Sequence, residues 1–426
     1  MRILLPIIQF PPDVNSTGLL MADLCEGLAK EGHEVSVITS FPHYEGFRIQ
    51  KEFRRKLFQR ERYKGMDVLR LYVYAPGKKN MLNRLISYLS FTGLAAVVGV
   101  SRRKSWDVIL CPNGGFFIGV TSWLIGALKR IPFIYNVQDL YPEVPVQAGQ
   151  LRNRYAIEGL KRIESFMYRK ANHITVISSA MRENLCAKGV PLGKISILPN
   201  FVNTDFIRPL PRSNPFSVAH GLEGKFVTMH AGNVGYVYDF DSLLEAAAML
   251  ASEKEILFLI IGEGVAKADL ERKAKEMRLH NVRFMAFQPY ETLPWLRASA
   301  DLQLSLYKAG SAMYSMPSKI YEIMASGRPL LSSAERGSAV WEIVDQNRCG
   351  ICIDPEKPEQ IAEAILTLYH DPVLRERMGR NGRDCAEKMY CKDVAVQSYH
   401  RLIQEIVGKG NAGALATGAA KGQRAG

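Results

Sequence analysis

The stretch "RILLPIIQFPPDVNSTGLLMADLCEGLAKEGHEVSVITSF", residues 2–41, indicates the fold of the chain. Apolar runs at 2–9 and 33–41 predict two buried strands. Between them, Leu20, Leu24 and Leu28 recur at helical spacing, and Gly32 suits the position just past a helix end. A strand, a loop, a helix and a second strand are typical of a doubly wound parallel sheet, which binds ligands at the carboxyl ends of its strands.

The same alternation continues along the chain. Further strands are predicted at 68–74, 107–111, 133–137 and 173–178, with helices at 115–129 and 154–170. A Pro- and Asn-rich stretch at 197–216 predicts a linker, and a second series of strands and helices begins at residue 225. We therefore predict an α/β chain of two Rossmann-like domains, 1–203 and 204–390, that face each other across a central cleft.

Length and charge agree with this organisation. The chain has 426 residues, which exceeds one typical core, and its net charge of +13 implies anionic partners. No nucleic-acid-binding motif is apparent, so we expect no nucleic acid partner. Cys349 and Cys352 form a lone C-x-x-C that predicts packing in a strand and no metal site. Without an apparent signal peptide, a reducing, cytoplasmic setting is expected.

A basic segment at 51–104 surrounds an apolar run at 85–100. The run is shorter than the roughly 20 residues of a spanning helix. Its basic flanks favour a helix that dips into an anionic leaflet, which predicts peripheral (monotopic) association with the inner membrane. The alternative is a buried core helix of the first domain. At the other end of the chain, residues 408–426 are of low complexity, which predicts a disordered tail.

Two glycine-rich strand ends in the second domain suit a phosphate-containing ligand, because glycine lets backbone amides approach it. They are "HAGNVG" (230–235) and "IIGEG" (260–264). A tight strand–helix turn is the alternative explanation for each. The residues concerned are Gly232, Asn233, Gly235, Gly262, Glu263 and Gly264.

The stretch "SMPSKIYEIMASGRPLLSS" (315–333) predicts a short helix that begins near Pro317 and ends before Gly327. Lys319 and Glu322 lie three residues apart, on one face of that helix. Lys319 suits a diphosphate, and Glu322 suits a pair of sugar hydroxyls. The alternative is that the two residues form a surface ion pair. In the first domain, Asp139 follows the strand at 133–137 and is expected to point into the cleft, or else to order its loop.

Together, the stretches 15–39, 137–149, 231–235, 260–264 and 317–331 resemble the family-four glycosyltransferases of the GT-B fold. The resemblance extends to about residue 405 and is greatest to the branch that builds bacterial capsule, O-antigen and exopolysaccharide (fucosamine transferase-like proteins). It implies retaining transfer from a nucleotide sugar without metal or other cofactor, and a helix at 391–407 that returns to the first domain.

The resemblance also assigns roles to residues. It places Glu322 on the donor ribose, Gly18 in the first loop near the diphosphate and the acceptor, and Asp139 in the cleft. We expect the acceptor to lie near the first loop and the loop after the second strand. The residues assigned to it are Ser16, Thr17, His43 and Tyr44.

Two departures from the family pattern affect the donor site. Tyr314 stands where the first glutamate of the E-x7-E motif is expected, and Asn233 and Asp239 stand where many members carry Arg and Lys. The charge of the leaving diphosphate therefore needs another partner. We assign it to Lys319, with Lys308 and the backbone amides of 314–318 as further candidates. The remaining donor-site residues are Tyr314, Ser315, Met316, Pro317 and Ser318.

The predicted function is transfer of a sugar, an N-acetylated or deoxy amino sugar, from a UDP-sugar to a polyprenyl-diphosphate-linked saccharide in bacterial surface polysaccharide synthesis. Lys319, Glu322 and Asp139 form the predicted catalytic set; Asp139 either positions substrate or serves as general base. A UDP-sugar 2-epimerase of the same fold and a non-catalytic assembly scaffold are the alternatives.

Overall fold

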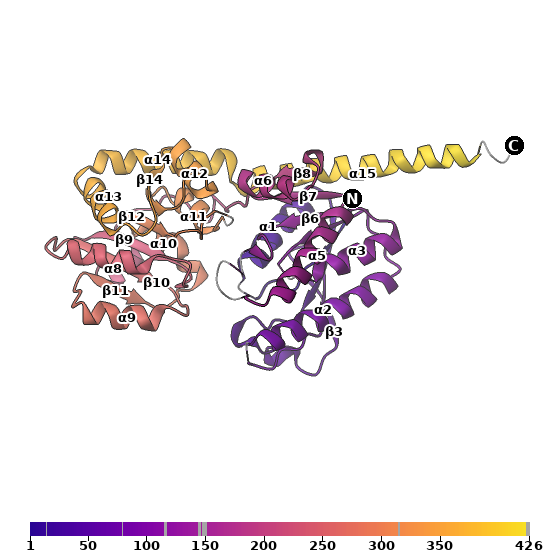
Figure 1. The fold of residues 1–426 in the computed structure, drawn as a ribbon, viewed down its shortest axis with the longest axis horizontal. Coiled ribbons are helices and arrows are strands. Elements are labelled where there is room, and N and C mark those ends of the chain that lie inside the picture. Colours follow the sequence, from indigo (N-terminus) through magenta and orange to yellow (C-terminus); the bar gives the residue numbers. More distant parts are fainter. Residues whose placement is uncertain are drawn as a thin grey trace. The chain divides into compact units, whose positions relative to one another are not determined.

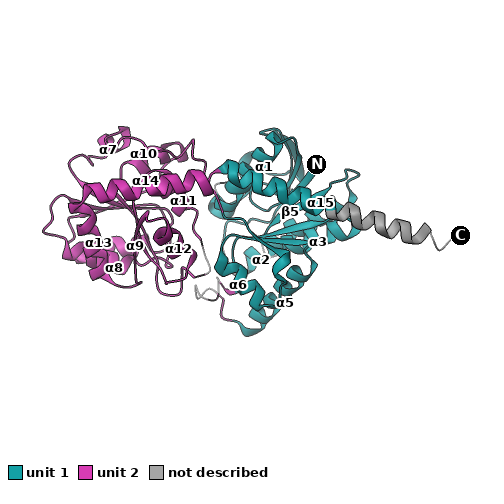
Figure 2. Cartoon of the chain, turned by 90° about the horizontal axis from the view of Figure 1, so that it is seen from above, with its two compact units in different colours: residues 1–142, 153–199, 392–426 teal, residues 143–152, 200–391 magenta. Residues whose placement is uncertain are grey.

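The computed structural model describes residues 1–422 except 14, 79, 115–116, 144–145, 147–150 and 314–315. The side chains of residues 81 and 409–422 are also outside the description. The chain forms two compact units. Unit 1 consists of Met1–Pro142, Asn153–Pro199 and Lys392–Gly426, and unit 2 of Glu143–Arg152 and Asn200–Cys391 (Figure 2). The change from unit 1 to unit 2 between Pro199 and Asn200 falls within the predicted linker.

Unit 1 contains an eight-stranded sheet with the order β3-β4-β2-β1-β5-β6-β7-β8. All neighbours are parallel except β3 and β4. The strands are β1 Arg2–Pro6, β2 Glu34–Ser40, β3 Phe58–Tyr63, β4 Met66–Leu71, β5 Val108–Pro112, β6 Phe133–Val137, β7 His173–Val176 and β8 Ile195–Ile197. The strand β3 was not predicted, because half of its residues, FQRERY, are charged, as is common for an edge strand.

The helices of unit 1 pack around this sheet (Figure 1). They are α1 Ser16–Lys30, α2 Met81–Ser101, α3 Ile118–Lys129, α5 Arg154–Lys170, α6 Ser179–Ala187 and α15 Lys392–Gly422, with the 3-10 turns η1 Glu45–Phe47, η2 Lys51–Phe53 and η3 Leu192–Lys194. Among the described helices, only α2 is long and apolar enough to cross a membrane, and 28% of its apolar window is buried.

The helix α15 packs on α1. A Cβ at Gly27 of α1 would lie 2.2 Å from Cγ2 of Val396, so glycine is needed for this close approach. Nζ of Lys392 donates to Oε2 of Glu26 at 2.9 Å. A hydrogen bond of 2.9 Å also joins Nε2 of His33 and Nδ1 of His400. The terminal helix thus belongs to unit 1. Its side chains beyond residue 408 lie outside the described residues, so the disordered tail stays a prediction.

Unit 2 contains a six-stranded, fully parallel sheet with the order β11-β10-β9-β12-β13-β14. The strands are β9 Phe226–Ala231, β10 Ile256–Ile261, β11 Val282–Met285, β12 Leu302–Leu306, β13 Leu330–Ser333 and β14 Gly350–Ile353. The helices are α7 Pro215–Ala219, α8 Phe240–Met249, α9 Lys267–Glu276, α10 Leu293–Ala298, α11 Lys319–Ala325, α12 Ala339–Gln346, α13 Pro358–His370 and α14 Pro372–Met389, and η4 Tyr290–Thr292 is a 3-10 turn.

The strand orders locate the ligand-binding edge of each sheet. In unit 2, β10 lies on one side of β9, and the chain then crosses to place β12 on the other side. In unit 1, β2 and β5 flank β1 in the same way. Such a reversal of strand order leaves a crevice at the carboxyl ends of the two central strands, where open α/β sheets bind ligands. The relevant loops therefore follow β9 and β12 in unit 2, and β1 and β5 in unit 1.

The C-x-x-C pair packs at the start of β14. Cys349 is buried and its thiol lies 3.8 Å from the carbonyl oxygen of Val344, while the thiol of Cys352 lies 3.9 Å from that of Trp341. Within the described residues, no group of three or more His, Cys, Asp or Glu side chains is arranged to hold a metal ion.

Candidate functional site

The glycine-rich loops after β9 and β10 pack directly against each other. Gly232 and Gly262 have φ angles of 147° and 149°, a backbone conformation that residues with a side chain rarely adopt. A Cβ at Gly262 would lie 1.8 Å from the carbonyl oxygen of Gly232, and a Cβ at Gly264 would lie 2.1 Å from that of Val234. The close approach of the two loops thus explains these glycines, and it leaves Asn233 and Glu263 exposed beside them.

The helix α11 begins at Lys319, with Ser318 as its N-cap, so the predicted start at Pro317 is two residues too early. Pro317 instead precedes the cap. The helix is only seven residues long, and it ends before Gly327, whose φ of 68° suits that position. The structure does not describe Tyr314 and Ser315, and the predicted contacts of both residues lie outside the described part of the chain. Met316 is buried.

Lys319 is buried, with 7% of its surface exposed, and its amine has no hydrogen-bond partner among the described residues. The Nζ atom lies 3.9 Å from the centroid of the Tyr238 ring and 5.9 Å from that of Tyr307. Burial, and then the nearby charge of Arg297, hold the pKa of this amine well below its usual value. An unpartnered buried amine is costly, so an anion at this position would supply the missing interaction.

Glu322 pairs with Arg297, a residue that was not predicted from the sequence to belong to the site. Arg297, on α10, donates from Nη2 to Oε2 of Glu322 at 2.7 Å and from Nη1 to Oε1 of Gln303 at 2.7 Å. The guanidinium is 3% exposed, while the carboxylate is 26% exposed. Glu322 therefore does not form the surface ion pair with Lys319 that we considered as the alternative. An arginine in the apolar segment "LPWLRASA" was the available signal.

The ring of His230, at the end of β9, completes the surroundings of Lys319. It is buried, and it lies edge-on to the rings of Tyr238 and Phe240. Burial, and then the charge of Lys319, hold its pKa well below the usual value, so the imidazole is neutral at pH 7. Lys319 therefore lies among aromatic rings, where a positive charge would be stabilised by their faces.

Lys308 and Asp239 have other partners. The Nζ atom of Lys308 lies 3.7 Å from Oδ2 of Asp241, at a half-buried position. Asp239 caps α8, since its Oδ1 accepts from the backbone N–H of Ser242 at 3.2 Å. Of the two lysines proposed for the diphosphate, only Lys319 thus has an amine without a hydrogen-bond or ion-pair partner among the described residues.

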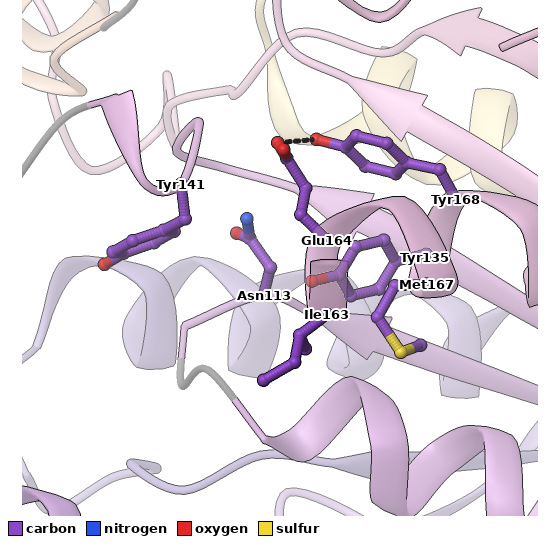
Figure 3. Close-up of a pocket in the computed structure, with 7 residues that line it drawn as sticks. All are labelled: Asn113, Tyr135, Tyr141, Ile163, Glu164, Met167 and Tyr168. Carbon is purple, nitrogen blue, oxygen red and sulfur yellow. Dashed lines mark hydrogen bonds between the residues drawn. The ribbon is translucent and has the colours of Figure 1, made fainter. Parts of the chain in front are cut away.

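In unit 1, Asp139 lies at the carboxyl end of β6, and Asn113 after β5 holds its backbone. Asn113 accepts from the N–H of Gln138 at 2.8 Å and donates to the carbonyl oxygen of Asp139 at 2.6 Å. Burial raises the pKa of the Asp139 carboxyl. A small cavity of about 10 Å³ lies next to this segment, enough for about one water molecule (Figure 3). Its lining residues are Asn113, Tyr135, Tyr141, Ile163, Glu164, Met167 and Tyr168.

The residues predicted to bind the acceptor lie at the start of α1 and in the loop after β2, at the same edge of the unit 1 sheet. Ser16 and Thr17 begin α1, and Gly18 lies so close to Gln9 that a Cβ there would be 2.7 Å from its carbonyl oxygen. His43 is buried, and its Nδ1 lies 2.9 Å from the carbonyl oxygen of Phe41, which gives the ring a structural role.

The buried carboxylate of Asp13 orders the loop that carries His43 and Tyr44. It accepts from both of their backbone N–H groups at 3.1 Å. Desolvation raises the pKa of this carboxyl, while the two backbone hydrogen bonds oppose the rise. The sequence analysis missed this role of Asp13.

The two units match two models of one class of enzyme. Residues 18–200 match the "Glycosyl transferase 4-like domain", and residues 215–385 match "Glycosyl transferases group 1". Together these matches span most of both units. The chain belongs to the group 1 glycosyltransferases, and its two Rossmann-like domains with parallel sheets confirm the predicted GT-B class of fold.

Two of its relatives are themselves named as glycosyltransferases. The chain is 25% identical over 397 residues, 88% of its length and 95% of the relative's, to the putative colanic acid biosynthesis glycosyl transferase WcaI of Escherichia coli K12. It is 27% identical over 332 residues (78% and 82%) to the probable glycosyltransferase WbjE of Pseudomonas aeruginosa. The solved structure of Anabaena HepE in complex with UDP is similar, with a TM-score of 0.72 at 15% identity over 95% of this chain and all of HepE.

Proposed function

We propose that this protein transfers a sugar from a UDP-sugar, with retention of configuration, to a saccharide linked to a polyprenyl diphosphate. The observation that carries this proposal is the buried amine of Lys319, which has no hydrogen-bond partner among the described residues and lies three residues before Glu322 and beside the glycine loop after β9. A buried amine at the ligand-binding edge of a sheet, which an anion would hold in its charged form, suits a diphosphate. The UDP complex of HepE and the colanic acid relative favour UDP and a bacterial surface polysaccharide; an N-acetylated or deoxy amino sugar is the proposed donor sugar.

In the proposed reaction, the bond between the anomeric carbon and the diphosphate oxygen breaks, and the acceptor oxygen bonds to the same face of that carbon. The acceptor proton passes to the departing phosphate oxygen, so no protein nucleophile is needed. Lys319 stabilises the charge that develops on the diphosphate, and Glu322 accepts hydrogen bonds from the ribose hydroxyls. Asp139 orients the acceptor; because burial raises its pKa, its carboxylate is a stronger base than that of an exposed aspartate and also suits the role of a general base.

A panel of nucleotides tests the class of donor. We expect UDP and UDP-sugars to raise the melting temperature of the protein, by about 4 °C or more at saturation, and GDP to raise it less. With a UDP-sugar alone, no 2-epimerisation should occur. Epimerisation in the absence of an acceptor would show that the protein is an epimerase, and the absence of any nucleotide shift would contradict enzymatic use of this site.

The helix α2 supports the proposed association with a membrane. Phe91 and Ala95 are fully buried, but Leu82, Leu89 and Val97 on its other side are 64%, 49% and 65% exposed. One face of the helix therefore belongs to the core, as in the core-helix interpretation of the sequence. The other face is exposed, as the membrane interpretation requires. An apolar stripe with basic residues at its end, such as Arg102 and Arg103, suits the surface of an anionic bilayer.

We therefore expect the protein to bind vesicles that contain phosphatidylglycerol, and to bind them several-fold more weakly at high salt, since basic flanks contribute to the attraction. Leu85→Glu/Leu89→Glu should abolish the binding. Leu192→Glu is the matched control, because Leu192 is 61% exposed on η3 of the same unit. Equal binding by both variants, or no vesicle binding by the wild-type protein, would contradict this proposal.

A further inference from the structure

A second, larger cavity lies in unit 1, at the ligand-binding edge of the sheet. Its walls come from the loop after β2 and the segment after β4, and its volume is about 370 Å³. Because β2 and β4 are parallel neighbours, both of these segments leave the sheet at its carboxyl edge, where Asp139 also lies. The lining residues are Arg48, Ile49, Arg54, Tyr72, Tyr74, Ala75 and Pro76.

The two segments are joined by backbone contacts. Arg48 and Pro76 form an isolated antiparallel bridge, and the N–H of Gly77 donates to the carbonyl oxygen of Phe47 at 2.7 Å. Gly77, with a φ of 88°, also makes room for a cavity arginine: a Cβ there would lie 2.1 Å from Nε of Arg48. The glycine therefore allows the Arg48 side chain to lie across the turn.

Within the described part of the chain, no carboxylate pairs with the two arginines of this cavity. Arg48 and Arg54 have no carboxylate partner there, and Nε of Arg54 makes only a long hydrogen bond of 3.4 Å to the carbonyl oxygen of Ile49. Guanidinium groups bind phosphate oxygens with two parallel hydrogen bonds each. Two of them in one cavity, with the tyrosines Tyr72 and Tyr74 on its wall, suit a diphosphate better than a single carboxylate.

An apolar surface begins where this cavity ends. The backbone N–H of Tyr74 donates to Oγ of Ser90 at 3.0 Å, so the cavity wall is attached to α2. On α2, Leu85, Ile86 and Leu89 are 42%, 38% and 49% exposed. The helix follows the cavity segment directly in the chain, since α2 begins at Met81. A cationic cavity beside an exposed apolar stripe matches a ligand that has a charged head and a hydrocarbon tail.

We propose that this cavity binds the diphosphate of the lipid-linked acceptor, with Arg48 and Arg54 on the phosphates and the first prenyl units on the exposed face of α2. The proposal rests on the proposed function and adds a binding site for the acceptor's lipid portion. It places the diphosphate at the same sheet edge as Asp139, so that the saccharide on it extends along the edge on which the acceptor hydroxyl must react.

Binding of farnesyl diphosphate, a short soluble prenyl diphosphate, tests this site. The titration is carried out with saturating UDP, which occupies the donor's own diphosphate site. We expect Arg48→Gln/Arg54→Gln to weaken binding at least tenfold, since the variant removes both guanidinium–phosphate pairs. Arg60→Gln/Arg62→Gln is the control: it removes the same charge from exposed positions of the neighbouring β3, and it should change the affinity less than twofold.

Further probes separate the head from the tail. Farnesol and inorganic diphosphate should each bind at least tenfold more weakly than farnesyl diphosphate. Inorganic diphosphate that binds equally well would show an anion site without a lipid function. If the Arg48→Gln/Arg54→Gln and Arg60→Gln/Arg62→Gln variants lost affinity for farnesyl diphosphate equally, general electrostatic attraction would explain the binding. Either result overturns the proposal. The UDP-induced rise in melting temperature is read separately, so failure of the donor function is distinguishable from failure of this site. Arg54→Glu, which reverses one charge, provides a second variant if the double one unfolds.

Discussion

Replacing Lys319 by methionine is expected to lower kcat by about 100- to 1,000-fold, while the KM for the UDP-sugar changes far less. The reason is that the diphosphate gains charge as the sugar leaves it, and a preorganised cation is worth most in that state. Removal of one such group typically costs about 3–4 kcal/mol of transition-state stabilisation. Steady-state kinetics that vary the donor at saturating acceptor separate the two constants.

The same variant should be more stable than the wild-type protein when no ligand is bound. The Lys319 amine is buried without a hydrogen-bond partner among the described residues, and methionine fills the same space beside Tyr238 without a polar group. We expect the melting temperature to rise by roughly 2–4 °C, which corresponds to about 1 kcal/mol in a domain of this size. A residue whose removal stabilises the fold while it destroys activity is maintained for function.

Lys273→Met is the matched control, since Lys273 is a 45% exposed lysine of unit 2 that pairs with Asp241. It should leave kcat within twofold of the wild-type value. An unchanged kcat in Lys319→Met would contradict the assigned role. A fall in its melting temperature would show instead that the amine has a structural partner.

Replacing Glu322 by glutamine should raise the Kd for UDP at least tenfold and also destabilise the unliganded protein. The carboxylate is the partner of a guanidinium that is only 3% exposed, so the variant leaves a buried charge without its counterion. Because Glu322 itself is partly exposed, we expect a loss of about 2 kcal/mol, below the range for a fully buried pair. The melting temperature should fall by about 4–8 °C.

A double variant separates these two effects. Arg297→Met/Glu322→Gln removes the buried charge together with its partner, so most of the lost stability should return. The affinity for UDP should not return, because the acceptor of the ribose hydrogen bonds is still missing. If the double variant bound UDP as tightly as the wild-type protein, Glu322 would act only as the counterion of Arg297, and the assignment to ribose would be wrong.

Much of the fold could be predicted because its strands are buried. The strands β1, β5, β6, β9 and β10 are almost entirely apolar in sequence, and buried parallel strands have that composition. By contrast, β3 reads FQRERY, and its charged residues concealed an edge strand in the basic segment.

The site could be predicted only where residues close together in the sequence form it. The spacing of Lys319 and Glu322 on one helix face is a local property. Their partners are not: Arg297 lies 25 positions before Glu322, and Tyr238 reaches Lys319 from the loop after β9. No pattern in the segment 315–333 could show that the Lys319 amine is buried without a hydrogen-bond partner among the described residues, since its ring neighbours Tyr238 and Tyr307 lie outside that segment. For the same reason, the sequence did not show that Arg48 and Arg54 line one cavity of unit 1.

A crystal structure of the protein with UDP tests the central claim most directly. We predict that a phosphate oxygen lies within about 3.2 Å of Nζ of Lys319 and that the ribose hydroxyls donate to the carboxylate of Glu322 at about 2.7 Å. UDP bound at another place, or bound here without contact between Lys319 and a phosphate, would contradict the claim.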